Sequence, residues 1–198
     1  MPIMTLLPLL ATVAISAPEA DTGFIRRMLS SKPAGNVFAD LLVGPDGRVE
    51  HCELLYTEDS RRKAERYCEA TLGLEAGEPG IGPDGNPAYG VATFDLVVRP
   101  DGVPNARVPA RPADIEVGVA SLPAQYGTRL RVPLVVFVSD GGRVLDCATD
   151  GNGPADYVAV ACQQLRQGTL PVRHNKADAP VAYVDGLLAD FVVEPAVP

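Results

Sequence analysis

The sequence predicts an α+β fold of two tandem small units, each a three-stranded antiparallel sheet with one helix packed on one face, in the order strand, strand, helix, strand. The prediction starts from an internal repeat. Residues 46–49 read DGRV, residues 141–144 read GGRV about 95 positions later, and a cysteine follows each motif, at Cys52 and Cys147. A second cysteine follows in each copy, and the copies end alike, in FDLVVRP and ADFVVEP. Such a long-period repeat defines the architecture before any single residue is interpreted.

Each unit begins with a predicted hairpin. Residues 132–138, VPLVVFV, form an apolar run rich in β-branched residues, and its length favours a strand. The turn SDGG then reverses the chain with glycines that accept positive φ, and residues 143–148 return as the second strand. The first copy repeats this pattern with strands at 38–43 and 48–55 around the turn GPDG.

A helix is expected after each hairpin. Asp59 or Ser60 can cap the first helix, and Asn152 or Gly153, followed by Pro154, can start the second. One stripe of each helix is apolar at the spacing i, i+3, i+4, i+7, and the second cysteine of each copy belongs to it. The stripe residues are Ala64, Tyr67, Cys68 and Thr71 in the first helix and Val158, Ala161, Cys162 and Leu165 in the second.

The chain therefore divides into five segments. Each unit closes with a last strand, expected at 90–98 in the first copy and at about 182–193 in the second. The segments are 1–17, a signal peptide; 18–36, an N-terminal lead-in; 37–99, the first repeat; 100–131, a linker in which the alternating residues 115–119 can add a short edge strand; and 132–195, the second repeat.

The four cysteines fall two in each copy, so each unit can contain one covalent cross-link. Units this small bury little apolar surface and commonly add a disulfide or a metal. One cysteine of each pair lies on the second strand and the other on the helix, so we expect the bonds Cys52–Cys68 and Cys147–Cys162 in a structural role. Closing a loop of about 15 residues stabilises a fold by about 3 kcal/mol. Reduced thiols and a zinc site are the alternatives, although the chain lacks the close Cys-x-x-Cys pairs of most zinc sites.

The N-terminus is compatible with export to an oxidising compartment. Residues 4–17 are apolar and uncharged and end in small residues that a signal peptidase can cut, although no Lys or Arg precedes them. We expect a cleaved signal peptide and a periplasmic protein. The alternative is an inner-membrane anchor with the protein facing the periplasm, and membrane contact is expected only if this segment is retained.

The charge of the chain argues against nucleic acid as a partner. The formal net charge is −8, whereas phosphate binding needs concentrated Lys and Arg. A local basic cluster at 61–66 is interspersed with acidic residues and is interpreted as a solvated helix face.

The order of these elements resembles the C-terminal domain of TonB. Residues 46–49 look like the hairpin signature of that family, and residues 84–87 (DGNP) look like its motif before the last strand. Residues 141–144 and 178–181 occupy these places in the second copy, and the paired cysteines look like a variant in which the second strand is bonded to the helix. The resemblance covers roughly residues 37 to 99 and 132 to 194.

The resemblance implies a protein-binding module whose exposed sheet edge accepts an extended peptide by strand addition. In that family the partner is an N-terminal segment of an outer-membrane transporter. An energy-transducing TonB also has a membrane helix and a long Pro-rich spacer, which this chain does not show in recognisable form. We therefore expect a periplasmic TonB-like module that binds an extended peptide or envelope protein. The alternatives are a membrane-anchored TonB-type energy transducer for outer-membrane transport and a structural envelope protein whose repeats pair through sheet edges.

No catalytic constellation is found in the sequence. It contains neither a Gly-x-Ser-x-Gly elbow nor a glycine loop that cradles phosphate. His51 beside Cys52 suggests an activated thiol, which a disulfide at Cys52 would exclude. We expect a protein that is not an enzyme, with no catalytic residue, no cofactor and no metal.

Overall fold

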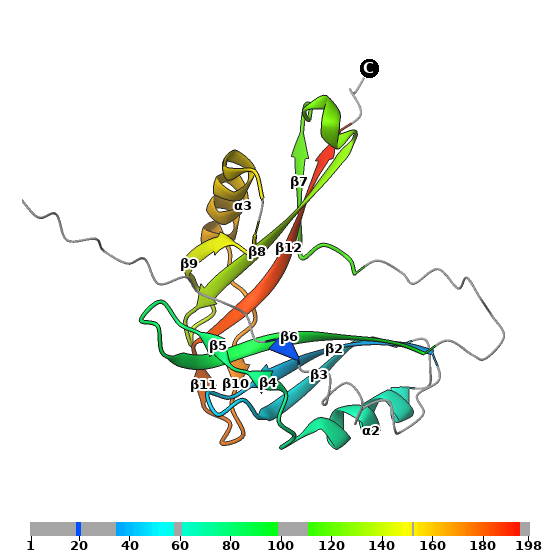
Figure 1. Ribbon diagram of the computed structural model, residues 1–198, viewed down its shortest axis with the longest axis vertical. Helices are drawn as coiled ribbons and strands as arrows, with labels where there is room; N and C mark the ends of the chain where they lie inside the picture. The colour runs from blue at the N-terminus through cyan, green and yellow to red at the C-terminus, as the bar shows by residue number, and fades with distance from the viewer. Residues whose placement is uncertain (1–18, 21–34, 58–60, 99–110, 152, 195–198) are drawn as a thin grey trace, which may run out of the picture.

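The computed structural model describes residues 19–20, 35–57, 61–98, 111–151 and 153–194, whose fold is α+β. Strands predominate over a few short helices (Figure 1). The elements are β1 (Glu19–Ala20), β2 (Gly35–Val43), β3 (Val49–Thr57), α2 (Arg61–Thr71), β4 (Gly77–Glu78), β5 (Gly80–Ile81), β6 (Pro87–Val98), β7 (Ile115–Val119), the 3-10 helix η1 (Ala124–Tyr126), β8 (Arg129–Val138), β9 (Val144–Thr149), α3 (Ala155–Gln167), β10 (Arg173–His174), β11 (Pro180–Val181) and β12 (Tyr183–Val193).

The strands of the two sequence copies belong to one eight-stranded sheet, where the sequence predicts a separate sheet for each copy. The main path is β3-β2-β6-β12-β8-β9, with β5 beside β6 and β7 beside β12. Neighbours within each copy are antiparallel, whereas the last strands of the two copies, β6 and β12, pair in parallel through residues 89–91 and 183–185. This parallel junction makes the two copies a single sheet.

Both hairpins and both helices form close to the predicted positions. The strands β2, β6 and β8 begin about three residues before the predicted starts, because their pairing extends past the apolar runs. The helix α3 begins directly after Pro154, which makes no side-chain cap. The cap expected from Asp59 or Ser60 for α2 lies outside the described residues, as does a cap from Asn152 for α3.

Gly47 and Gly142 occupy matching turns and have positive φ values of 75° and 80°. A Cβ on Gly47 would overlap the carbonyl oxygen of Gly77, and a Cβ on Gly142 would overlap that of Leu170. The two glycine carbonyls accept hydrogen bonds from the N–H groups of Ala76 (2.9 Å) and Leu170 (2.8 Å), which follow the helices. Both turns therefore require glycine for the same reason, which is the close approach of the segment after the helix.

The helices α2 and α3 cover opposite faces of the sheet. In β2, Leu41 and Val43 pack in one cluster with Ala64 of α2, whereas Leu42 belongs to the cluster that contains Ala161 of α3. Consecutive residues of a strand point to opposite faces, so the two helices lie on opposite sides. Figure 1 shows them far apart, at the two ends of a strongly twisted sheet.

The two clusters differ in size. Among the described residues, the cluster beneath α2 has six buried members, three of which are alanine. The cluster beneath α3 has fifteen buried members and includes Tyr183 and Phe191 of β12 together with Leu42 and Val91 from the first copy. The larger core thus also includes residues of the first copy.

The linker contributes the expected edge strand. Residues 115–119 form β7, which pairs in parallel with residues 189–193 at the end of β12. The Asp114 N–H donates to the Leu188 carbonyl (2.8 Å), and the Asp114 carboxylate accepts a hydrogen bond from the Leu188 N–H (2.7 Å).

The expected signal peptide, 1–17, lies outside the described residues, so its cleavage remains a prediction. In the part of the chain that the structure describes, no helix has the length and apolar character needed to cross a membrane.

Candidate binding groove at the edge of the sheet

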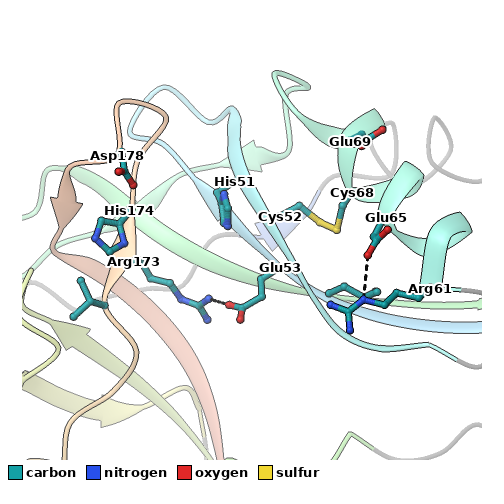
Figure 2. A pocket seen from close by; sticks show the side chains of 12 residues that line it. His51, Cys52, Glu53, Arg61, Glu65, Cys68, Glu69, Arg173, His174 and Asp178 are labelled. Atoms are coloured by element: carbon teal, nitrogen blue, oxygen red, sulfur yellow. Dashed lines mark hydrogen bonds and ion pairs between the residues drawn. A yellow bond between two sulfur atoms is a disulfide. The ribbon is translucent and has the colours of Figure 1, made fainter.

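A groove of about 640 Å³ lies along the outer edge of β3 (Figure 2). Its volume is within the range of pockets that bind ligands. It is lined by residues 51–54 of β3, by Arg61, Glu65, Cys68 and Glu69 of α2, and by Val172, Arg173, His174 and Asp178 around β10 and β11. Segments about 110 residues apart in the sequence thus form opposite walls of one groove.

The floor of the groove is the edge of β3. This strand ends the order of the sheet, so one side of its backbone pairs with β2 and the other side faces outward. Its first residue is covered, because Val49 donates to the Leu74 carbonyl (2.9 Å) and accepts from the Gly73 N–H (2.8 Å). Beyond Val49, the described residues place no further strand against this edge. An unpaired edge of this kind is a template for an added strand.

One wall is the helix α2, which a disulfide fixes to β3. Cys52 and Cys68 are bonded with their Cα atoms 5.2 Å apart, and Cys147 and Cys162 join β9 to α3 in the same way at 5.7 Å. The structure thus contains both expected bonds. Because Cys52 is bonded, His51 has no free thiol beside it to activate.

The other wall is the segment of β10 and β11, which Arg173 fixes to the first copy. Its guanidinium makes a 2.6 Å ion pair with Asp40 of β2 and a second ion pair with Glu53 of β3, shown in Figure 2. Asp40 also accepts a hydrogen bond from the Thr93 hydroxyl (3.0 Å). The Arg173 side chain is only 10% exposed, so its ion pairs with Asp40 and Glu53 are internal contacts of the fold.

Further contacts hold the same segment at both ends. The Lys176 N–H donates to the Glu50 carboxylate (3.1 Å), and the Lys176 ammonium lies 3.6 Å from the same group. The Tyr183 hydroxyl donates to the carbonyl of Pro171 (2.6 Å), just before β10. The wall is therefore anchored from before β10 to the turn that precedes β11.

Burial changes the ionisation of the groups behind this wall. Burial opposes the charge on Arg173, but Asp40 and Glu53 outweigh it and raise the arginine pKa above its ordinary value. Burial, reinforced by repulsion from Asp40, raises the pKa of Asp185 to about 8. Burial likewise raises the pKa of Tyr183 to about 12. Near neutral pH, Arg173 is therefore charged, while Asp185 and Tyr183 keep their protons.

Sequence reasoning finds only the cysteines of this groove. It misses Asp40, Arg173 and Asp185 and assigns no role to His174, although His51 and His174 both line the groove. A signal for two of them exists, because Asp40 and Asp185 interrupt the strand sequences FADLLV and VDGLLAD. A charged residue within an apolar strand indicates a buried partner.

Comparison of the chain with protein-family models, with curated proteins and with solved structures finds no match. The resemblance to the TonB C-terminal domain therefore stays a prediction, based on the order of the motifs in the sequence.

Proposed function

We propose that this protein is a non-catalytic binding module that takes up an extended peptide segment as an added strand beside β3. The observation that carries the proposal is the coincidence of a sheet edge, beside which the described residues place no further strand after Val49, with a groove of about 640 Å³ along it. Backbone hydrogen bonds supply affinity in this mode of binding, and the side-chain environment of the groove supplies selectivity.

The two walls favour an extended ligand over a helix. The edge of β3 lies between α2 on one face of the sheet and the β10–β11 segment on the other, as Figure 2 shows. Side chains of an added strand would point alternately to these two walls, because successive residues of a strand face opposite sides. Both walls are fixed, α2 by a disulfide and the β10–β11 segment by Arg173, so the groove needs little ordering when it binds.

We further propose that the protein acts in the cell envelope as a tandem of TonB-like units, with a segment of an envelope protein as the partner. Two disulfides support an oxidising compartment, and the repeated hairpin, helix and strand order supports the relation to TonB.

The test uses isotope-labelled protein and an acetylated, amidated peptide, Thr-Val-Thr-Gln-Gln-Val-Thr, in an NMR titration. Strand addition should shift the amide signals of residues 51–54 and slow the exchange of those β3 amides that point away from β2. Methylating alternate backbone nitrogens of the peptide should abolish binding for one set of positions and leave it intact for the other. Shifts confined to another surface, or equal effects of both methylation sets, would contradict strand addition at β3.

A further inference from the structure

We infer that the segment bound beside β3 is basic and presents Lys or Arg side chains to both walls of the groove. The inference rests on the proposed strand addition and specifies the partner. It is drawn from the charges that line the groove and from a comparison with the second copy of the fold.

The groove carries uncompensated negative charge. Its two arginines are already engaged, because Arg61 pairs with Glu65 (3.0 Å) and Arg173 pairs with Asp40 and Glu53. Glu69 and Asp178 also line the groove, and among the described residues neither carboxylate has an ion-pair partner. A ligand that enters this groove therefore meets two free carboxylates and no free arginine.

The hairpin and helix of one copy form without three of these acidic side chains. The second copy builds the same hairpin and disulfide-bonded helix, and its residues can be matched to the first copy by counting from the bonded cysteines. Three groove carboxylates then correspond to uncharged residues: Glu53 to Ala148, Glu65 to Ala159 and Glu69 to Gln163. These three carboxylates thus distinguish the edge of β3 from the equivalent edge of β9, where Asp146 takes the place of His51.

The two free carboxylates lie on opposite walls. Figure 2 shows Asp178 on the turn between β10 and β11 and Glu69 on α2, with His51 and the disulfide of Cys52 between them. An added strand turns successive side chains toward opposite walls, so of two adjacent basic residues one would face the wall of Asp178 and the other the wall of Glu69. The net charge of −8 would also speed the approach of such a segment.

The experiment compares three acetylated, amidated peptides, Thr-Val-Thr-Xaa-Xaa-Val-Thr, in which Xaa is Lys, Gln or Glu. Binding to the whole protein is measured by NMR titration at low and at high salt. The Lys peptide should bind about fivefold more tightly than the Gln peptide at low salt, and the Glu peptide should bind more weakly than either. High salt should reduce this preference, because exposed charges are screened.

Variants assign the preference to the groove. Glu69→Gln combined with Asp178→Asn should remove most of the preference for Lys, and Asn suits the positive φ of 59° at position 178. The matched control, Asp156→Asn on the exposed face of α3, should leave the preference unchanged. Equal binding of all three peptides at β3 would overturn the inference and leave strand addition standing. A Lys preference that persists in the double variant would also overturn it, and failure of all three peptides to bind would refute strand addition itself.

Discussion

Arg173 is the residue on which the shape of the groove depends. It joins a segment of the second copy to Asp40 and Glu53 of the first copy, 133 and 120 residues earlier in the chain. Removing one partner of a buried ion pair strongly destabilises the folded protein, because the remaining charge is left without compensation. Arg173 therefore acts as a positioning residue that places one wall of the groove.

Asp185 should make the stability of the protein depend on pH. Its pKa is raised from 3.8 to about 8, so the folded protein keeps a proton that the unfolded chain releases above about pH 4. Stability should therefore fall as the pH rises from about 4 to about 8, by a total of a few kcal/mol. We predict that Asp185→Asn removes this loss.

Urea unfolding of both proteins at pH 5, 7 and 9 tests this prediction. The midpoint of the variant should exceed that of the original protein by an amount that grows with pH, because an asparagine side chain at this position has no proton to release. A parallel loss of stability in both proteins between pH 5 and 9 would show that other groups set the pH dependence.

The two helices are attached to the sheet in different ways. Of the α2 side chains that the structure describes, only Ala64 and Thr71 are buried, and the bond between Cys52 and Cys68 joins this helix to β3. The helix α3 buries Ala161, Cys162 and Leu165 in the larger core. A disulfide therefore matters more for the position of α2 than for that of α3.

Replacing each cysteine pair by alanine should separate these roles. Loss of either bond should lower stability by about 3 kcal/mol, because the closed loops have similar lengths of 16 and 15 residues. Hydrogen exchange of the native protein should show α2 losing protection in Cys52→Ala/Cys68→Ala, whereas α3 stays protected in Cys147→Ala/Cys162→Ala. Undiminished protection of α2 without its disulfide would contradict this account.

The elements could be predicted because their signals are local. Apolar alternation, glycine turns and the helical spacing around Cys68 and Cys162 each involve residues that are close in the sequence. The wall of the groove could not be predicted, because alternation shows that Asp40 faces one side of the sheet and does not show that Arg173 reaches it from 133 residues away. The groove is therefore a product of the tertiary structure.

At the scale of the whole molecule, the junction of β6 and β12 combines the two copies. It consists of only three residue pairs in parallel. Parallel strands are not joined by a tight turn, so no turn motif in the sequence reveals that they pair. The repeat predicts two similar halves, yet it does not show that their last strands pair. The same junction places Asp185 near Asp40 and so creates the buried charges behind the groove.

The unequal cores predict that only the second copy folds by itself. Among the described residues, the cluster beneath α2 has six buried members, half of them alanine. On the opposite face of the same strands, Leu42 and Val91 are buried as part of the core of the second copy. A unit of about 60 residues is marginal even with a complete core. Residues 111–194 contain the whole larger cluster except Leu42 and Val91.

We therefore expect the oxidised fragment 111–194 to unfold cooperatively in urea and to give dispersed NMR signals. The oxidised fragment 35–98 should show neither a cooperative transition nor dispersed signals. Adding fragment 111–194 to labelled fragment 35–98 should restore dispersed signals, because it supplies β12 and the missing core. A dispersed spectrum from fragment 35–98 alone would show instead that the two copies are independent folding units.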